Sequence, residues 1–343
     1  MSPHSPVVIL SERLGPVTEI ERRMEQGRAT IRAAPLWNAD QIREHATDAS
    51  IIILGAVEPF DAEILARLPT TIAIVRRGVG YDNVDVDAAT EHGIIVANVP
   101  DASVEEVSDH ALALLLCMER GIPWLDSAVR AGLWQRDPAQ IETIRAPSRR
   151  FNSLTIGVVG LGRIGRATAR KARALYGRTL GSDPVVTKQQ AADCGAELVP
   201  LDELLASSDH ISIHAPLLPA TQNLINADSL SRCRAGAVIV NTSRGGLVDE
   251  AALIKAVESG RIRSAGLDVT CNEPLPREDE LLRSPQIILT AHSAAISTTT
   301  KIELASRSVD AAVALLRGEL PESVVNADVL DSPVLRLSKI PSG

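Results

Sequence analysis

Short runs rich in β-branched and other apolar residues alternate with amphipathic segments along the first hundred residues of the chain. The apolar runs predict strands over residues 7–10, 29–33, 51–55, 72–75 and 94–99. The amphipathic segments predict helices over residues 17–26, 40–49, 61–68 and 85–92. Because a strand, a helix and another strand in this order need a crossover connection, the pattern predicts a parallel sheet with helices on its faces.

A second series of the same kind fills the rest of the chain. Six strands are expected, over residues 156–160, 179–182, 211–214, 238–241, 265–269 and 287–290. The clearest helices between them span residues 165–176, 201–206 and 249–259. Six strands complete a doubly wound sheet, so the predicted fold class is α/β with two doubly wound parallel-sheet domains. A length of 343 residues agrees, because single cores usually split beyond roughly 250–300 residues.

Two longer helices, expected over residues 104–120 and 297–318, bracket the second sheet. The later helix follows a sheet that is already complete, so we expect it to return to the first domain. The first domain is then discontinuous, with residues 1–103 plus 293–343, and the second is inserted as residues 104–292. Two chain crossings between domains predict a hinge.

The stretch 121–151 fits neither sheet. It contains Trp124, Trp134 and a basic cluster of Arg145, Arg149 and Arg150. An arm of this length is uncommon unless it packs on something, so we expect it to contact a second subunit in a homodimer.

Composition excludes several classes of function. The net charge of −8 and the acidic pI of about 5.5 argue against a nucleic-acid surface, which needs a basic patch. The apolar run 111–118 is far shorter than the roughly 20 residues that cross a bilayer, and the first fifteen residues do not resemble a signal peptide. We therefore expect a soluble, cytoplasmic protein without nucleic-acid or membrane partners.

The four cysteines, at positions 117, 194, 233 and 271, are far apart in the sequence. No Cys-x-x-Cys motif is present, and we expect buried, reduced thiols. No pair of histidines has metal-ligand spacing with a carboxylate, so no metal site is expected.

A glycine-rich turn joins the first strand of the second series to its helix. Gly160, Gly162 and Gly165 form a G-x-G-x-x-G motif, with Arg163 and Ile164 at the start of the helix. The first glycine permits a tight turn, the second lets the backbone approach a pyrophosphate, and the third lets the helix lie close to the strand. Free N–H groups at the helix start attract the anion. The motif predicts a Rossmann domain that binds a dinucleotide.

Asp183 follows the next strand, where an acid contacts the ribose 2′-hydroxyl of NAD. A carboxylate about 4 Å from a phosphate charge costs about 4 kcal/mol at an effective dielectric near 20, so NAD is preferred to NADP. The alternative interpretation makes Asp183-Pro184 a simple turn.

Arg244, Glu273 and His292 follow three successive strands of the second sheet, at the edge where such sheets bind ligands. A guanidinium binds a carboxylate or carbonyl oxygen in a fixed fork. An imidazolium delivers a proton to a developing alkoxide, and a carboxylate keeps that imidazole charged. These residue types predict 2-keto acid chemistry. The alternative interpretations are that Arg244 is an ordinary surface arginine and that Glu273, which precedes a proline, only forms part of a turn.

With these residues the sequence resembles the D-isomer-specific 2-hydroxyacid dehydrogenase family over nearly its whole length. Five blocks carry the resemblance, namely 78–85, the glycine motif, 212–221, 241–249, and Glu273-Pro274 with His292. Segments 104–109, 140–142 and 318–323 are similar to the C-terminal-binding-protein branch of that family.

The resemblance implies a flavodoxin-like substrate domain with an inserted NAD domain, a homodimer built around the arm, and an active site in the cleft. It implies that Arg244 orients the substrate and polarises its carbonyl. His292 is then the general acid in keto reduction and the base in oxidation, and Glu273 pairs with it and raises its pKa.

The resemblance also implies binding residues. Backbone N–H groups of the loop 78–80, including Val79 and Gly80, are expected to bind the substrate carboxylate, with Arg76 as a second anchor. Asp268 is expected near the nicotinamide. Further cofactor contacts are implied for residues along the groove. These are His214, Pro216, Thr221 and Thr242.

Two departures from the family pattern concern the substrate. Ala295 stands where the C-terminal-binding-protein branch has an aromatic residue. The small alanine side chain leaves room over the substrate, so Ala295 is a candidate substrate contact. Ala291 replaces the usual proline before His292, which is expected to loosen the backbone.

Two alternatives to a common 2-hydroxyacid dehydrogenase stay open. The first is an NAD(H)-sensing interaction protein of the C-terminal-binding-protein type, which keeps the same three residues. No long basic or disordered tail follows the last expected helix, and this favours the enzyme. The second is a reductase for an unusual acid, such as a phosphonate or a large keto acid, for which Ala295 makes room.

Overall fold

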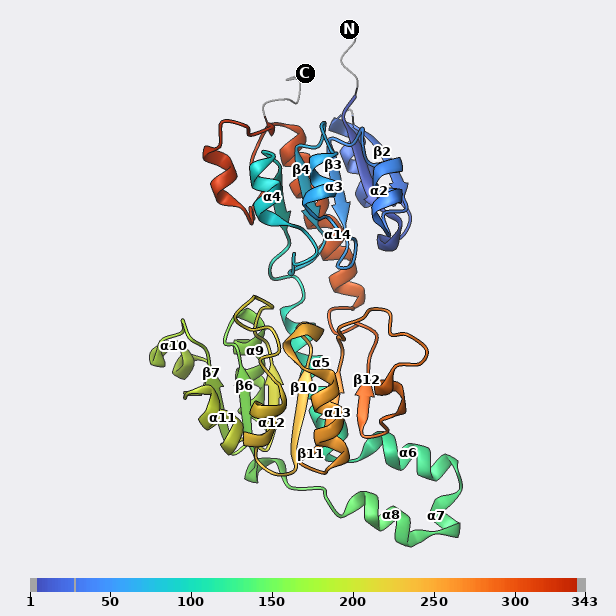
Figure 1. Cartoon of the computed structure of the whole chain (residues 1–343), viewed down its shortest axis with the longest axis vertical. Helices are drawn as coiled ribbons and strands as arrows, with labels where there is room; N and C mark the ends of the chain where they lie inside the picture. Colours follow the sequence, from blue (N-terminus) through green and yellow to red (C-terminus); the bar gives the residue numbers. More distant parts are fainter. Residues whose placement is uncertain (1–4, 28, 338–343) are drawn as a thin grey trace. The chain divides into compact units, whose positions relative to one another are not determined.

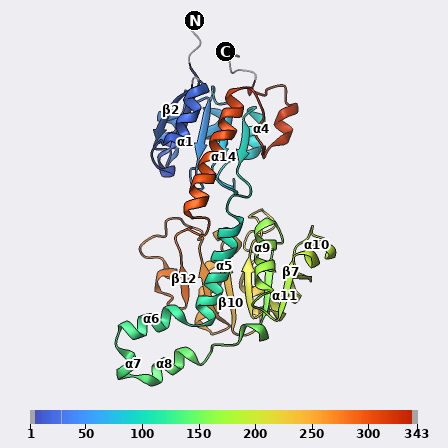
Figure 2. The same ribbon diagram turned by 180° about the vertical axis from the view of Figure 1, so that it is seen from behind.

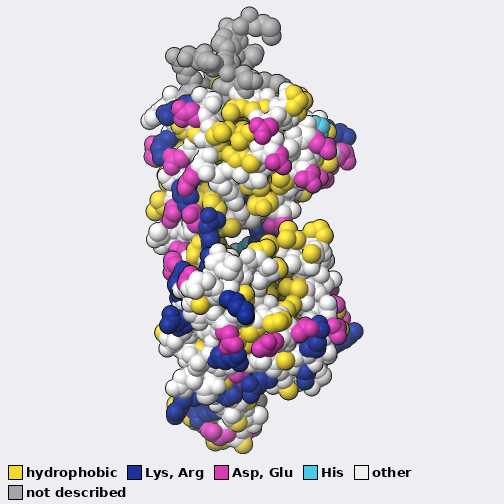
Figure 3. Space-filling model, turned by 90° about the vertical axis from the view of Figure 1, so that its left-hand side faces the viewer, with side chains coloured by type: hydrophobic (Ala, Val, Ile, Leu, Met, Phe, Trp, Pro, Cys, Tyr) yellow, Lys and Arg dark blue, Asp and Glu magenta, His cyan; other side chains and the backbone are white. Residues whose placement is uncertain are grey.

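The computed structural model describes residues 5–27 and 29–337 (Figure 1). The chain divides into two compact units, residues 1–103 with 297–343, and residues 104–296. Among the described residues, no helix is long and apolar enough to cross a membrane. Figure 3 shows acidic and basic side chains interspersed on the face that it presents.

The first unit is built on a five-stranded parallel sheet in the order β2-β1-β3-β4-β5. Its strands are β1 (Val7–Ser11), β2 (Thr30–Ala34), β3 (Ile51–Leu54), β4 (Ala73–Arg76) and β5 (Ile95–Asn98). This is the flavodoxin-like strand order.

Alternate residues of these strands supply two cores, because successive side chains of a strand point to opposite faces. Ile9 packs with helices on one face, which are α2 (Ala39–His45), α3 (Ala62–Ala66) and α4 (Val86–Glu91). Val8 and Leu10 pack on the other face with α14 (Thr298–Leu316). Helix α1 (Glu19–Arg22) lies beside α14, as Figure 2 shows; Figure 1 gives the opposite view.

The second unit is built on a seven-stranded parallel sheet in the order β12-β11-β10-β9-β6-β7-β8. Its strands are β6 (Thr155–Val159), β7 (Arg178–Ser182), β8 (Glu197–Leu198), β9 (His210–Ile213), β10 (Ala237–Asn241), β11 (Ile262–Leu267) and β12 (Ile287–Leu289). The strand order reverses between the neighbours β6 and β9, which makes their carboxyl ends the topological switch point of a Rossmann sheet.

Helices cover both faces of this sheet. One face carries α5 (Val104–Glu119) and α9 (Arg163–Ala172), which Figure 2 shows in front. The other carries α11 (Leu201–Ser207), α12 (Ala227–Arg232) and α13 (Glu250–Glu258), visible in Figure 1. The predicted α/β class with two parallel sheets is confirmed.

Several details differ from the sequence prediction. The second sheet has seven strands rather than six, because β8 is a two-residue edge strand with no detectable periodicity. Two short helices, α10 (Lys188–Asp193) and α12, were not predicted. The helix expected over residues 17–26 consists of α1 and a following 3-10 segment, Arg23–Gly27.

The stretch 121–151 forms three helices, α6 (Ile122–Arg130), α7 (Leu133–Arg136) and α8 (Pro138–Arg145), which we call the arm. The side chains of Ile122, Val129 and Trp134 are exposed, with Trp134 at 58%. Trp124 connects the arm to the segment before β12, since its indole N–H donates to the Pro285 carbonyl at 2.7 Å.

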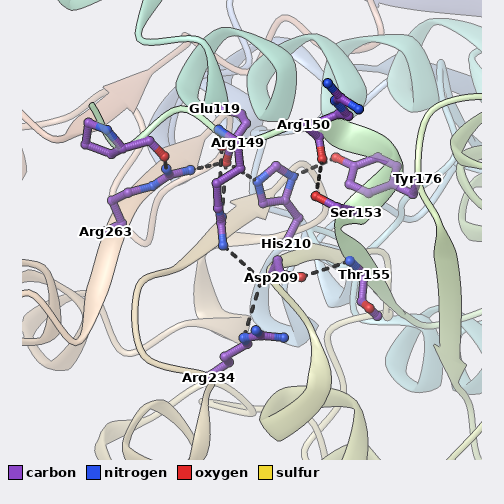
Figure 4. Close-up of polar contacts among 11 residues, drawn as sticks. Glu119, Arg149, Arg150, Ser153, Thr155, Tyr176, Asp209, His210, Arg234 and Arg263 are labelled. Atoms are coloured by element: carbon purple, nitrogen blue, oxygen red, sulfur yellow. Dashed lines mark hydrogen bonds and ion pairs between the residues drawn. The ribbon is translucent and has the colours of Figure 1, made fainter. Parts of the chain in front are cut away.

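A buried polar network holds both ends of the arm (Figure 4). Glu119, the last residue of α5, is fully buried and accepts hydrogen bonds from His210, Arg149 and Arg263. Arg149, which follows the arm, also pairs with Asp209 at 2.8 Å. Residues before and after the arm therefore meet at the amino ends of β9 and β11.

The cysteines are free, but not all of them are buried as expected. Cys194 and Cys233 are buried, Cys117 is half-buried and Cys271 is exposed. Cys271 lies in the loop after β11, and its backbone N–H donates to Glu250 at 2.7 Å.

Candidate active site

The glycine motif lies at the switch point and has the geometry of a phosphate-binding turn. Gly160 adopts φ +88°, and a Cβ there would stand 2.6 Å from the Ala215 nitrogen. A Cβ on Gly165 would lie 1.9 Å from the Gly160 carbonyl oxygen, so this glycine lets α9 approach the strand. A Cβ on Gly162 would meet nothing within 4 Å. The helix starts after Gly162 without a side-chain cap, so no capping side chain occupies its first N–H groups.

Asp183 follows β7 and is bound to the glycine turn. Its carboxylate accepts the Leu161 N–H at 2.8 Å through one oxygen and the Val185 N–H at 2.9 Å through the other. These bonds hold the acid beside the turn, as the sequence predicts for a ribose-binding residue. A carboxylate has about four acceptor positions, so two such bonds leave capacity for a ligand hydroxyl.

Two buried polar atoms near the switch point have no hydrogen-bond partner among the described residues, His214 Nδ1 and Thr242 Oγ1. Both residues were predicted to line the cofactor groove. His214 contacts Ser212 Oγ through Nε2 at 2.8 Å, and burial lowers the pKa of its imidazole to about 4. Unsatisfied buried polar atoms are rare, and together with the open space at Gly162 they fit a dinucleotide in this groove.

The loop after β9 is closed by Thr221. Its hydroxyl donates to the Pro216 carbonyl at 2.7 Å and accepts the Leu218 N–H at 2.8 Å. Pro216 and Thr221 thus belong to one exposed loop that follows the switch-point strand.

Arg244 follows β10 and is held on its strand end by Asn241. Asn241 donates to the Arg244 carbonyl at 2.8 Å and accepts the Ser243 N–H at 3.0 Å. A Cβ on Gly245 would lie 2.0 Å from the carbonyl carbon of Thr270, so this glycine brings the Arg244 loop against the loop after β11.

Glu273 and His292 meet directly. His292 Nδ1 lies 2.7 Å from Glu273 Oε2, and the other Glu273 oxygen accepts the Thr270 N–H at 3.0 Å. His292 has a left-handed backbone with φ +49°, which is unusual for a residue other than glycine.

The electrostatics of Glu273 link all three residues. Burial of its carboxylate raises its pKa, but the hydrogen bond and charge of His292, the Thr270 N–H and the charge of Arg244 together lower it. The carboxylate is therefore ionised at neutral pH and stabilises positive charge on the imidazole. Within the second unit, the structure brings together Arg244, Glu273 and His292 as the sequence predicts.

Asp268 is buried and has several hydrogen-bond partners that the sequence does not indicate. Its side chain is 1% exposed, and its carboxylate accepts from the Thr290 hydroxyl and from the N–H groups of Ser293 and Ala294. These bonds hold the segment that Ala291 was expected to loosen. Sequence reasoning missed Thr290 as a partner, and its place at the end of β12 is the one signal that could have found it. Contact between Asp268 and the nicotinamide stays a prediction.

The candidate substrate residues of the first unit lie at the end of β4, which is Arg76, and in the loop after it. Asn98 donates to the Val79 carbonyl at 2.7 Å, whereas no described residue accepts a hydrogen bond from the N–H of Val79 or Gly80. Arg76 is buried, and its guanidinium donates to the Arg77 carbonyl at 2.6 Å. Arg77 is buried as well, so these two adjacent arginines do not form a solvated surface pair.

Arg77 has a structural partner. It is buried and pairs with the buried Glu21 at 2.9 Å, and it also donates to the Ser308 hydroxyl. In the second unit, Ala295 lies between the buried Ala294 and the exposed Ile296, directly after the segment held by Asp268.

Residues 112–294 match the family model described as D-isomer specific 2-hydroxyacid dehydrogenase, NAD binding domain. A glyoxylate reductase from Korarchaeum cryptofilum is 37% identical over 291 residues, which are 84% of this chain and 86% of the relative. A D-3-phosphoglycerate dehydrogenase from Mycobacterium tuberculosis is 38% identical over 328 residues, which are 94% of this chain. The chain spans 59% of the length of that mycobacterial relative.

Solved structures agree with these relatives. A glyoxylate reductase from Paecilomyes thermophila is similar with a TM-score of 0.82 and 31% identity, over 95% of this chain and 99% of that one. An NADPH-dependent glyoxylate/hydroxypyruvate reductase from Sinorhizobium meliloti is similar with a TM-score of 0.81 and 30% identity, over 95% and 98%. The glycine turn, the unpartnered atoms His214 Nδ1 and Thr242 Oγ1 and the family match all lie in the second unit. The chain belongs to the D-isomer specific 2-hydroxyacid dehydrogenase family and carries its NAD-binding domain.

Proposed function

We propose that the protein interconverts a 2-keto acid and a D-2-hydroxy acid with NAD, and that Arg244, Glu273 and His292 carry the reaction. The observation that supports this most directly is the 2.7 Å contact between His292 Nδ1 and Glu273 Oε2. NAD, when bound, supplies the hydride acceptor for oxidation and, as NADH, the hydride donor for reduction.

His292 is the general acid and base. A carboxylate only accepts hydrogen bonds, so Nδ1 carries a proton and donates a hydrogen bond to Glu273. The other ring nitrogen, Nε2, exchanges a proton with the substrate oxygen. In keto reduction Nε2–H protonates the developing alkoxide, and in oxidation the neutral Nε2 removes the hydroxyl proton. Glu273 stabilises the imidazolium in both directions.

Arg244 orients the substrate. Its guanidinium offers a planar set of donors that matches a carboxylate or the carbonyl oxygen beside it, and its charge favours the oxyanion that forms at the carbonyl. The N–H groups of Val79 and Gly80, which donate to no acceptor in the part of the chain that the structure describes, are with Arg76 the proposed anchors for the substrate carboxylate. The proposed cofactor contacts are the glycine turn, Asp183, the orphaned atoms of His214 and Thr242, and the loop from Pro216 to Thr221.

The proposed substrate is a small 2-keto acid of the kind that the relatives' names indicate, glyoxylate or the keto acid of 3-phosphoglycerate. Ala295 leaves space for a larger side chain. We also propose that the arm forms a homodimer interface, because Ile122, Val129 and Trp134 expose apolar surface on it.

The test is NADH oxidation by the purified protein against 2-keto acids of increasing side-chain size, with NADPH measured alongside. The matched controls are Arg244→Ala and His292→Ala. Turnover that both substitutions abolish supports the proposal. Tight NADH binding without turnover of any acid would instead favour the alternative of an NAD(H)-sensing interaction protein of the C-terminal-binding-protein type.

A further inference from the structure

We propose that His110 and Thr290 are positioning residues for the reaction, because they hold Asp268 in place and Asp268 fixes the backbone of His292. The inference rests on the proposed function of His292. None of these three residues needs to touch the substrate for this role.

The Asp268 segment accepts three successive N–H groups that begin at His292. The His292 N–H donates to the Asp268 carbonyl at 2.8 Å. The Ser293 N–H donates to Oδ1 and the Ala294 N–H to Oδ2, both at 2.9 Å. Consecutive N–H groups that converge on a carboxylate form an anion-binding nest. The nest offsets the cost of the left-handed backbone at His292, which a residue other than glycine adopts only where its surroundings hold it there.

Thr290 and His110 form a chain of hydrogen bonds that connects the Asp268 carboxylate to helix α5. Thr290 Oγ1 lies 2.6 Å from Asp268 Oδ1, and because the carboxylate accepts, the threonine proton points to Asp268. His110 Nε2 lies 3.0 Å from the same Thr290 oxygen, so His110 is the donor to it. His110 Nε2 is 3.6 Å from Asp268 Oδ1, too far for a hydrogen bond, so His110 acts on the Asp268 carboxylate through the Thr290 hydroxyl.

The close packing of α5 on β11 brings His110 to this place. A Cβ on Gly266 would lie 3.3 Å from the Leu114 Cβ, so this glycine lets α5 lie near the strand. His110 is one helical turn before Leu114 on the same face of α5, and Asp268 is two residues after Gly266. The helix thus presents His110 at the carboxyl end of β11, where Asp268 begins the loop.

The consequence for catalysis is geometric. Without the His110 donor, the Thr290 hydroxyl and the Asp268 carboxylate lose an anchor on α5, and the His292 segment gains freedom to move. A misplacement of about 1 Å can cost a reaction about 100-fold, so a partial loosening is expected to lower kcat by about tenfold. Substrate and cofactor affinity should change little, because the proposed role requires no contact of His110 with either.

The test compares His110→Leu, which removes the donor at similar size, with His110→Gln, which keeps an N–H near the position of Nε2. Thr290→Val and the double variant H110L/T290V complete a mutant cycle, and Ala113→Gln on the exposed side of α5 is the control for general disturbance of the helix. We expect H110L to lower kcat about tenfold with KM nearly unchanged, H110Q to restore most of it, and the double variant to match T290V. Wild-type kcat in H110L, or losses that multiply in the double variant, would overturn the proposal.

An activity-independent measurement separates this proposal from the proposed function. The imidazole NMR signals of His292 at fixed pH should shift in H110L and T290V and stay near wild type in H110Q and A113Q. If the wild type reduces no 2-keto acid but these shifts occur, the proposed function fails and the positioning role stands. Unchanged His292 signals in H110L would refute the positioning role whatever the activity.

Discussion

The His292 imidazole donates from Nδ1 to Oε2 of Glu273 at 2.7 Å, although the two residues lie in loops after different strands. The bond fixes which ring nitrogen carries the proton toward the protein and leaves Nε2 for the substrate. The functional consequence of this pair can be tested by removing only its charge.

Glu273→Gln keeps the size of the side chain and removes its negative charge. We expect kcat for keto reduction to fall about 10–100-fold with a smaller change in KM, because imidazolium stabilisation is needed mainly in the transition state. Steady-state kinetics with NADH measure this. Glu280→Gln, in the 3-10 helix Glu280–Arg283 of the same connection between β11 and β12, is a matched control that should retain wild-type rates. An unchanged kcat in Glu273→Gln would show that the pair is not catalytic.

Asp183 is predicted to select NAD over NADP. Asp183→Ser removes the carboxylate that opposes the 2′-phosphate, a repulsion of about 4 kcal/mol per charge pair at close range. We expect the ratio of kcat/KM for NADH to that for NADPH to fall by about 100-fold or more. Asp183→Asn separates charge from structure, since its amide oxygen still accepts one of the backbone N–H groups. A ratio that stays constant in both variants would contradict the prediction.

His214 should make the stability of the protein sensitive to acid. Burial lowers its pKa from 6.5 to about 4, so the unfolded chain binds more protons than the folded one between these values. Stability is then fully present above pH 6.5 and decreases as the pH falls toward 4, by up to about 3 kcal/mol. Urea unfolding across this range measures the decrease, and His214→Asn should reduce its slope. An equal slope in the variant would show that other groups cause it.

The buried network at the ends of the arm should be important for stability. Burial raises the pKa of Glu119, but bonds from His210, Arg149 and Arg263 outweigh it and hold that pKa well below its ordinary value. Glu119→Gln leaves two arginines near a neutral amide, and we expect a loss of about 3–5 kcal/mol in unfolding free energy. Glu142→Gln breaks an exposed pair in the arm and should cost less than about 1 kcal/mol. Equal effects of the two substitutions would refute the importance of burial here.

The exposed apolar side chains of the arm predict its role in assembly. Trp134→Ser removes the largest of them, and we expect a dimer to dissociate at lower dilution than the wild type, as light scattering after size exclusion would measure. Leu320→Ser removes a side chain of similar exposure (50%) in the first unit and should leave the mass unchanged. A monomeric wild type would refute the homodimer proposal directly.

The sequence by itself determined the class of the fold and pointed to the residues of the candidate site. The apolar runs of the parallel strands are local signals, because a buried strand needs apolar residues wherever its neighbours lie. The glycine turn is equally local, since Gly160 must adopt φ +88° and Gly165 must have no Cβ. The order of Arg244, Glu273 and His292 after successive strands then implied one edge of one sheet.

The tertiary structure decided everything that depends on partners far apart in the chain. The two residues of β8 form a strand because they pair with β7 through backbone hydrogen bonds. The side chains of Glu197 and Leu198 give no local signal that predicts a strand. Glu119 and His210 are neighbours across 91 positions, and Arg77 is buried because Glu21 meets it. A buried charge is stable only beside its partner, and a partner of this kind is chosen by the folded chain rather than by the spacing of residues along it.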